Sequence, residues 1–237
     1  MSVQTSEPTE ERSRSRRGVL FYVGVTLVLA GLGLLGYVGW QVYGTNIVAR
    51  QTHQRVITDL QQTWRATGAL PGAPAAAVEP GNASALLRVP RFGDDYEVPV
   101  LEGIGDEVLS SGYGHFPNTA GPGETGNYAL AAHRITHGEP LRDMPRLRPG
   151  DDVLVETRDA IYTYRLDTDP NDLVVTFEAG WVVDPVPVNP QEGGVQPLSQ
   201  QPGQKLITLT TCAELFHTDN RMIVFGHLVG TEKKLPQ

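Results

Sequence analysis

The uncharged stretch from Gly18 to Trp40 constrains this chain more than any other feature of its sequence. It holds 23 residues, and at about 1.5 Å per residue an α-helix of that length crosses the roughly 30 Å hydrocarbon core of a membrane. A cleaved signal peptide has a shorter apolar core, closely followed by a small-residue cleavage site. We therefore expect an uncleaved transmembrane anchor over residues 18–40; a signal peptide with a long apolar core is the alternative.

The basic residues around this stretch predict its orientation. Several arginines lie between Arg12 and Arg17, directly before the apolar residues, and the next basic residue is Arg50, ten positions beyond them. Basic residues are retained on the cytoplasmic side of a membrane helix. The sequence therefore predicts a single-pass protein of the cell membrane, with a cytoplasmic tail over residues 1–17 and the remainder of the chain outside.

The rest of the chain divides into a juxtamembrane region and one globular domain. Residues 41–85 are expected to form a helix and then a linker, because Gly68 to Asn82 is rich in Ala, Pro and Gly. Residues 86–237 have the size of one ordinary domain, and the net charge of −8 argues against nucleic acid as a partner. The expected helix has these apolar positions, at irregular spacing: Val42, Ile47, Val56, Ile57, Leu60 and Trp64.

Many short β-type segments predict that the globular domain is mainly all-β, a barrel or a sandwich. These segments are rich in β-branched and aromatic residues and are separated by turn residues. The stretch 110–126 is rich in glycine and is expected to be a loop, as is the proline-rich stretch 184–204. The expected strands cover residues 86–90, 97–101, 127–134, 152–156, 160–166, 173–183, 205–212 and 221–225.

The last two of these strands bring two reactive side chains together. A short loop joins them, so they are expected to pair antiparallel, with Cys212 at the end of one and Arg221 at the start of the next. Opposed residues in such a pair have Cβ atoms about 4.5–5.5 Å apart. A guanidinium at that distance favours the thiolate form of a cysteine, which is the nucleophilic form.

Cys212 is also the only cysteine of the chain. In an oxidising extracytoplasmic compartment it has no partner for a disulfide within the chain. A buried cysteine that acts as a small apolar residue is one explanation, and a catalytic thiol is the other. A catalytic thiol requires an acid or base, and His133, at the end of the strand-like stretch 127–134, is the best candidate.

These residues resemble the motifs of the sortase family. The run Thr-Leu-Thr-Thr-Cys at 208–212, with Arg221 nine positions on, resembles the sortase cysteine signature. The run Ala-Ala-His-Arg at 131–134 resembles the sortase histidine motif, although that motif more often has glycine where this chain has Ala132. The resemblance spans roughly residues 87–232 and is greatest to class E sortases of high-GC Gram-positive bacteria. It implies a closed β-barrel of about eight strands with short helices, so that residues 86–237 are the catalytic domain.

The residue types and the resemblance together predict an acyl transfer. Cys212 would attack a peptide carbonyl to give a thioester, His133 as imidazolium would protonate the leaving amine, and Arg221 would stabilise the oxyanion. Thr210 and Thr211 are assigned to substrate binding, with packing within the strand as the alternative. By resemblance, the acyl donor is a secreted protein with a C-terminal sorting signal of the Leu-Pro/Ala-x-Thr-Gly type, cut after Thr. The acceptor is an amine of a peptidoglycan precursor.

Several alternatives stay open on the sequence alone. The same residues could serve a cysteine hydrolase with water as acceptor, or the domain could be a non-catalytic extracytoplasmic β-domain with a buried Cys212. The acid could be His115 or His217 in place of His133. The 184–204 loop is either a wall of the substrate groove, as the resemblance implies, or a solvated linker. We expect no cofactor and no metal, because the histidines and carboxylates lack metal-ligand spacing.

Overall fold

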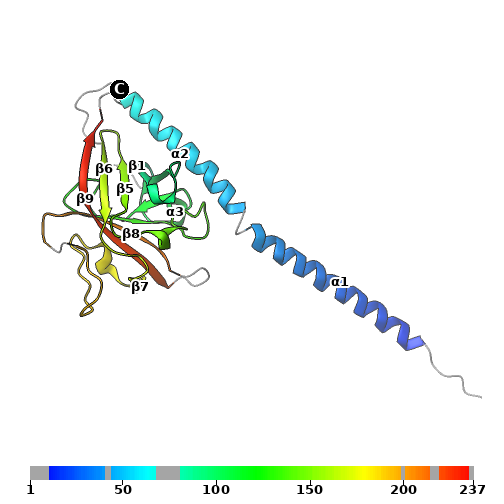
Figure 1. The fold of residues 1–237 in the computed structure, drawn as a ribbon. Coiled ribbons are helices and arrows are strands. Elements are labelled where there is room, and N and C mark those ends of the chain that lie inside the picture. Colours follow the sequence, from blue (N-terminus) through cyan, green and yellow to red (C-terminus); the bar gives the residue numbers. More distant parts are fainter. Residues whose placement is uncertain (1–10, 41–43, 68–80, 199–200, 214–218, 235–237) are drawn as a thin grey trace, which may run out of the picture. The chain divides into compact units, whose positions relative to one another are not determined.

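The computed structural model describes residues 11–40, 44–67, 81–198, 201–213 and 219–234. The chain forms two units, residues 1–44 and residues 45–237. The first unit contains α1 (Glu11–Gly39) and the second contains all other elements (Figure 1). Most of the expected linker between residues 68 and 82 lies outside the described residues.

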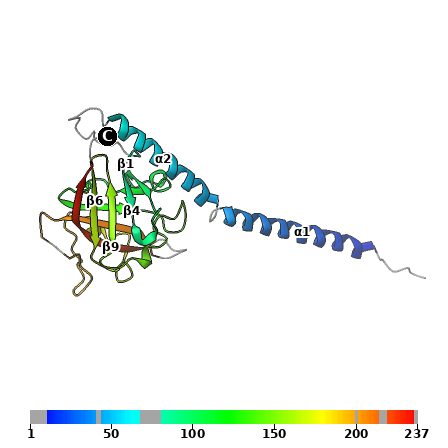
Figure 2. The same cartoon turned by 45° about the horizontal axis from the view of Figure 1, so that its top comes forward.

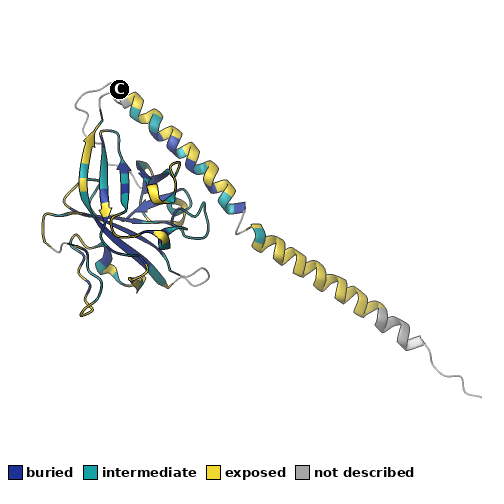
Figure 3. Cartoon of the chain, viewed as in Figure 1, coloured by how far each residue is buried: buried dark blue, intermediate teal, exposed yellow. Residues whose placement is uncertain are grey.

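The helix α1 exposes its apolar side chains. Within it, the 22 residues from Gly18 to Gly39 have the length and composition to cross a membrane. Leu20, Leu27 and Leu35 are each at least two-thirds exposed, and Figure 3 shows the span as exposed except at its last residue, Gly39. By its length and composition this span fits either a membrane anchor or a signal sequence.

The second helix, α2 (Thr45–Thr67), packs on the domain that follows it. Ile57 and Leu60 are buried against Leu86, and Trp64 packs beside them. The expected apolar pattern was only partly right, because Ile47 is 63% exposed and Val42 lies outside the described residues. The buried positions of α2 form one stripe, which begins at Ala49 and His53 and continues through Ile57 and Leu60 (Figure 3).

Besides α2, the described part of the second unit holds nine strands, one short α-helix and three 3-10 helices. The strands are β1 (Ala83–Arg88), β2 (Val98–Glu102), β3 (Tyr113–His115), β4 (Gly126–Ala131), β5 (Asp152–Glu156), β6 (Ala160–Leu166), β7 (Val174–Thr176), β8 (Lys205–Cys212) and β9 (Asn220–Lys233). The helices are η2 (Pro90–Phe92), α3 (Asp106–Leu109), η3 (Met144–Arg146) and η4 (Gly180–Val183).

Eight of the strands close into a barrel. Their order is β6-β5-β1-β2-β3-β4-β8-β9, and the pairing of β9 with β6 completes the ring, while β7 adds a ninth strand at the edge of β9. The pairs β2–β3 and β4–β8 are parallel and the others antiparallel. Figures 1 and 2 show β9 running across the barrel between β8 and β6. The expected closed barrel of about eight strands is therefore confirmed.

The long strand β9 closes the barrel because it changes partner along its length. It pairs with β8 from Arg221 to His227 and with β6 from Gly226 onward. Gly226 lies where both neighbours approach, and a Cβ there would come within 2.6 Å of the Arg165 carbonyl oxygen. Only glycine fits this crossing without moving the backbone.

Side-chain alternation divides β8 into two faces. Ile207 and Leu209 point inward and join the main core with Tyr128, Leu130 and Val224. Thr208, Thr210 and Cys212 alternate with them and face outward. The same alternation holds in β9, so the outward face carries Arg221 opposite Cys212.

Two sequence expectations for the strands were wrong. The stretch 110–126 contains the strand β3, which pairs with both β2 and β4 and is too short and glycine-rich to show a pattern. The stretch 173–183 forms only the three-residue strand β7 and then η4. The break falls at Ala179 and Gly180, whose amides turn back to the carbonyls of Thr176 and Glu178.

Candidate active site

An open groove of about 450 Å³ lies on the outward face of β4, β8 and β9. Its floor is formed by the ends of these three strands, and its walls come from α3 on one side and from the β7–η4 segment on the other. Cys212, His133 and Arg221 all line it, as do Thr210 and Thr211. The fold thus brings together in one groove all five residues that the sequence singled out.

Cys212 and Arg221 are directly opposed residues of the β8–β9 ladder. Cys212 is half-buried and is a free cysteine. Arg221 is also half-buried, and its Nη1 donates to the Asn220 carbonyl at 3.1 Å. The register places the thiol and the guanidinium on the same face of the pair, so a group bound at Cys212 lies within reach of a hydrogen-bond donor.

His133 approaches Cys212 because β4 and β8 run parallel. Ala131 is paired with Thr210, and beyond it the Ala132 amide donates to the Thr210 carbonyl at 3.2 Å. The Thr211 hydroxyl donates to the Ala132 carbonyl at 2.7 Å. These two hydrogen bonds extend the pairing of the two segments beyond the end of β4. His133 therefore follows β4 beside the point where Cys212 ends β8.

Thr210 and Thr211 are both buried, at 5% and 3% exposed. The Thr211 hydroxyl is engaged with Ala132, so its visible role is to align the two strand ends. Thr210 lies on the outward face, opposite Ile223, and lines the groove floor. Their assignment to substrate binding remains a prediction.

Arg134 adds a further tie between the two strand ends. Its Nη1 donates to the Cys212 carbonyl at 3.4 Å and, more closely, to the Ala213 carbonyl. The guanidinium thereby spans from the residue after His133 to the backbone of the cysteine itself. The sequence motif contains Arg134, but its role in holding the Cys212 backbone was not anticipated.

The surroundings of His133 favour its neutral form. Burial lowers the pKa of His133, and the nearby His137 lowers it further, against a smaller opposite effect of the Asp106 carboxylate. The two histidine rings are stacked with centroids 4.7 Å apart. At neutral pH the imidazolium expected from the sequence is therefore the less populated form of the resting protein.

The walls of the groove are largely apolar and were not identified from the sequence. The α3 side and the β7–η4 side both contribute to them: Ile104, Leu109, Phe116, Phe177, Val182 and Val183. None of the described residues of the 184–204 loop lines the groove. The wall nearest that loop is formed by the segment just before it.

Two buried polar residues fix the position of η4. The Asn127 side-chain Nδ2 donates to the backbone carbonyls of Val182 and Asp184, both at 3.1 Å. Thr208 in turn donates to the Asn127 Oδ1 at 2.8 Å. Both residues lie on the outward face of the sheet, below the groove wall. In the sequence, only their polar side chains within largely apolar strands indicated this structural role.

Of the two alternative histidines, the structure describes only His115, which lies away from the groove. His115 is buried in β3, where Nδ1 bonds Glu102 at 2.7 Å and Nε2 contacts the Thr119 hydroxyl at 2.9 Å. It does not line the groove, and its bonds are those of a structural residue. His217 lies outside the described residues. Within the described ranges, no cluster of three or more His, Cys, Asp or Glu residues could hold a metal ion.

Comparisons with known proteins match the barrel domain. The family model of the sortase domain matches residues 87–229. Sortase SrtE1 of Streptomyces coelicolor is 37% identical over 215 residues, which are 87% of this chain and 56% of that protein. The chain thus spans little more than half the length of that relative.

Two solved structures are similar in both sequence and fold. Sortase E from Streptomyces avermitilis is 38% identical, with a TM-score of 0.56, over 65% of this chain and 93% of that one. Sortase E1 from Streptomyces coelicolor, solved with a tripeptide in the active site, is 37% identical, with a TM-score of 0.55, over 66% and 94% of the two chains.

Proposed function

The chain belongs to the sortase family, and from that membership we propose that it is a cysteine transpeptidase of class E type with Cys212, His133 and Arg221 as its catalytic residues. The observation that carries the proposal is the shared groove. Cys212 and Arg221 are opposed on one strand pair, and the groove they line also receives His133 from a strand more than 70 residues away in the sequence.

The first half of the proposed reaction forms a thioester. The Cys212 thiolate attacks the substrate carbonyl carbon, and the Arg221 guanidinium donates hydrogen bonds to the resulting oxyanion. When the tetrahedral intermediate collapses, the C–N bond breaks and the His133 imidazolium protonates the leaving amine. The acyl group is then held on Sγ, and His133 is neutral.

The second half transfers the acyl group to an amine. The acceptor nitrogen attacks the thioester carbon, and neutral His133 takes the proton that this nitrogen loses. The C–S bond breaks and the Cys212 thiolate is regenerated. The lowered pKa of His133 suits the second half, since the imidazole accepts a proton there.

The proposed acyl donor is a C-terminal sorting signal of the Leu-Pro/Ala-x-Thr-Gly type, cut after Thr. Support comes from the apolar walls, which match apolar side chains such as the leucine of that signal. The related sortase E1 binds a tripeptide in its active site. The proposed acceptor is an amine of a peptidoglycan precursor.

The proposed setting is the outer surface of the cell membrane. In this arrangement α1 anchors the chain, residues 1–17 are cytoplasmic and the barrel is outside. The span Gly18–Gly39 and the arginines before it support the orientation. Protease added to intact protoplasts should remove the barrel; protection of the Cys212 region contradicts the orientation.

The deciding experiment combines a labelled peptide of the Leu-Ala-x-Thr-Gly type, a short peptide with a free amino group and the full-length chain in detergent micelles. We expect a new amide between the Thr of the signal and the added amine. Mass spectrometry of the protein should detect the acyl group on Cys212. Cys212→Ala should give neither product.

Two other outcomes identify the alternatives. Release of the free acid alone, at every acceptor concentration, would assign the chain to the cysteine hydrolases. Absence of cleavage, together with a Cys212 thiol that resists alkylation below neutral pH, would indicate a non-catalytic domain. The same assay on His133→Ala and His115→Ala tests the choice of histidine, since loss of general acid–base catalysis costs typically ~10²–10⁴-fold.

A further inference from the structure

The histidine loop, residues 133–141, is closed on the carbonyl of His133 itself. The Leu141 amide donates to that carbonyl at 3.0 Å. Within the loop, the His137 ring stacks on the His133 ring at an interplanar angle of 30°. A change in the path of this loop therefore moves both the His133 backbone and the His137 ring that packs against the His133 ring.

The tip of the histidine loop has an unfavourable backbone conformation. His137, Gly138 and Glu139 have φ values of 54°, 82° and 54°, so three successive residues are in the left-handed region. Glycine adopts this region freely, whereas His and Glu do so at a cost in free energy. Such a turn persists only where surrounding contacts hold it.

The contacts that hold the turn come from α2. Asn46 accepts a hydrogen bond from the Gly138 amide at 2.9 Å and donates one to Glu139 Oε1 at 2.8 Å. A Cβ on Gly138 would lie 2.9 Å from His53 Cε1 and 3.4 Å from Ala49 Cβ. These three α2 residues lie on one helical face, at spacings of three and four.

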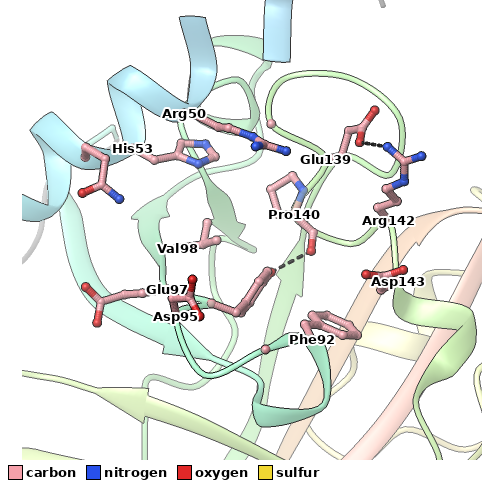
Figure 4. A pocket seen from close by; sticks show the side chains of 14 residues that line it. Arg50, His53, Phe92, Asp95, Glu97, Val98, Glu139, Pro140, Arg142 and Asp143 are labelled. Carbon is pink, nitrogen blue, oxygen red and sulfur yellow. Dashed lines mark hydrogen bonds and ion pairs between the residues drawn. The ribbon is translucent and has the colours of Figure 1, made fainter. Parts of the chain in front are cut away.

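Figure 4 shows a neighbouring pocket of about 430 Å³, which residues of α2 and of the histidine loop line together. Arg50 and His53 extend from α2 toward the loop segment with Glu139 and Pro140. From the barrel side, the Tyr96 hydroxyl donates to the Pro140 carbonyl at 2.7 Å. The tip of the loop is thus held between α2 and the barrel.

The rest of α2 is fixed on the barrel by apolar packing. Ile57 and Leu60 are buried against Leu86 of β1, and the Lys234 ammonium lies over the Trp64 ring at 4.7 Å from its centroid. These contacts continue the same helical face that holds the loop. The helix is therefore placed by the barrel at one end and supports the histidine loop at the other.

We propose that α2 is the positioning element for His133, with Asn46 holding the left-handed turn that sets the His137 ring against the His133 ring. The inference rests on the proposed function, in which His133 transfers the proton. Neither Asn46 nor His137 is among the described residues that line the groove. Both act through His133 and are positioning residues.

The groups around His133 determine how its pKa would change if the histidine loop were displaced. His137 faces it from the loop and Asp106 from α3, while Cys212 and Arg221 line the same groove from β8 and β9. Burial and then His137 lower the pKa of His133. If His137 moves away and the site opens, the pKa of His133 rises toward its ordinary value.

The test compares Asn46→Ala with a matched control, Thr58→Ala, an exposed α2 residue whose hydroxyl bonds only within the helix in the described contacts. The full-length chain is isotope-labelled at its six histidines, and the His133 resonance is titrated by NMR in micelles. For Asn46→Ala we expect a raised His133 pKa and a fall in kcat of about tenfold or more, with KM little changed. Thr58→Ala should change neither.

A rescue variant separates positioning from general loss of structure. Asn46→Asp places a second carboxylate beside Glu139 and should lower kcat as Asn46→Ala does. Adding Glu139→Gln restores the bond with donor and acceptor exchanged, and should recover much of the lost rate.

The outcomes distinguish this inference from the proposed function. An unchanged His133 titration and kcat in Asn46→Ala overturn the inference, whatever the melting temperature. If Asn46→Ala does not fold, His137→Gln takes its place, and an unchanged His133 titration there overturns it equally. Full activity of His133→Ala would reject the catalytic assignment, yet the NMR titration would still decide whether α2 positions His133.

Discussion

The two sides of the candidate site are built in different ways. Cys212 and Arg221 lie on neighbouring strands, opposed in a regular antiparallel ladder. His133 lies two residues beyond the end of β4, at the start of an irregular loop with a strained tip. The ladder holds its side chains through backbone hydrogen bonds, whereas the loop depends on side chains from α2. We therefore expect substitutions on the two sides to differ in their effects on activity and stability.

Arg221→Lys should have the largest effect, and the effect should be confined to the reaction. Lysine keeps the charge but loses the planar, two-pronged donor geometry. Removal of one oxyanion donor costs about 10²–10³ in rate, while the ladder itself stays intact. Steady-state transpeptidation and thermal melting on the same variant test this. Activity within a few-fold of the parent would reject the donor role, and a matching collapse in stability would point to a structural ion pair.

The α2 side should instead respond to acid. His53 is buried at 5% exposed, and burial, assisted by Arg50, lowers the pKa of its imidazole to about 4 from 6.5. As the pH falls below 6.5, His53 binds a proton in the unfolded chain but stays neutral in the folded chain. The stability associated with neutral His53 is therefore complete above 6.5 and is lost between about 6.5 and about 4.

This acid effect amounts to about 3 kcal/mol, since a tenfold difference in proton affinity is worth about 1.4 kcal/mol. Urea unfolding of the parent and of His53→Gln between pH 7.5 and 4.5 isolates it, because other groups titrate equally in both proteins. The parent should lose more stability on acidification. Parallel curves for the two proteins would show that His53 is not held neutral by the fold.

Gly138→Ala should have a smaller effect that combines strain and steric conflict. Its φ of 82° disfavours alanine, and the added Cβ would meet His53 and Ala49 of α2. Gly150→Ala is the matched control, because Gly150 has a φ of 94° and a Cβ added there would have no atom within 4 Å. We expect about 1–2 kcal/mol from the backbone in both variants, and a further loss of stability and of activity only in Gly138→Ala. Equal losses in both would argue against a tight contact with α2.

Thr211→Val should have the smallest effect and tests the junction between the two sides. The change keeps the shape of the side chain but removes the donor to the Ala132 carbonyl. A lost hydrogen bond of this kind costs about 1 kcal/mol, and the rate should fall several-fold because His133 and Cys212 are then less well aligned. Thr231→Val, at an exposed position of β9, is the control. If both variants behave alike, Thr211 does not align the strand ends.

Much of the cysteine side could be predicted from the sequence because its information is local. The β-branched residues before Cys212, the short loop and the strand from Arg221 define an antiparallel pair, and its register follows from the loop. The histidine side could be placed only by resemblance. The parallel pairing of β4 with β8 joins segments far apart in the chain, and no local pattern specifies it.

The α2 helix shows the same limit. An apolar pattern was sought, and Ile57, Leu60 and Trp64 were found correctly. The other end of this stripe consists of the half-buried Asn46 and the buried Ala49 and His53, whose small or polar side chains give no strong apolar signal. Their burial is decided by the histidine loop that packs on them. The strand β3 was missed for a related reason, since its pairing partners, and not its own composition, make it a strand.

Composition and short-range periodicity were enough to predict part of this protein. That part comprises the apolar span before residue 40, the all-β character of the domain and the opposition of Cys212 and Arg221. The tertiary structure was needed to show that the end of β4 lies beside the end of β8, which walls enclose the groove and why α2 is buried at Ala49 and His53. Hydrophobic periods, and strand pairs joined by a short loop, depend on residues that are neighbours in the sequence. Closure of the barrel pairs strands that are far apart in the sequence, and no local pattern specifies those pairs.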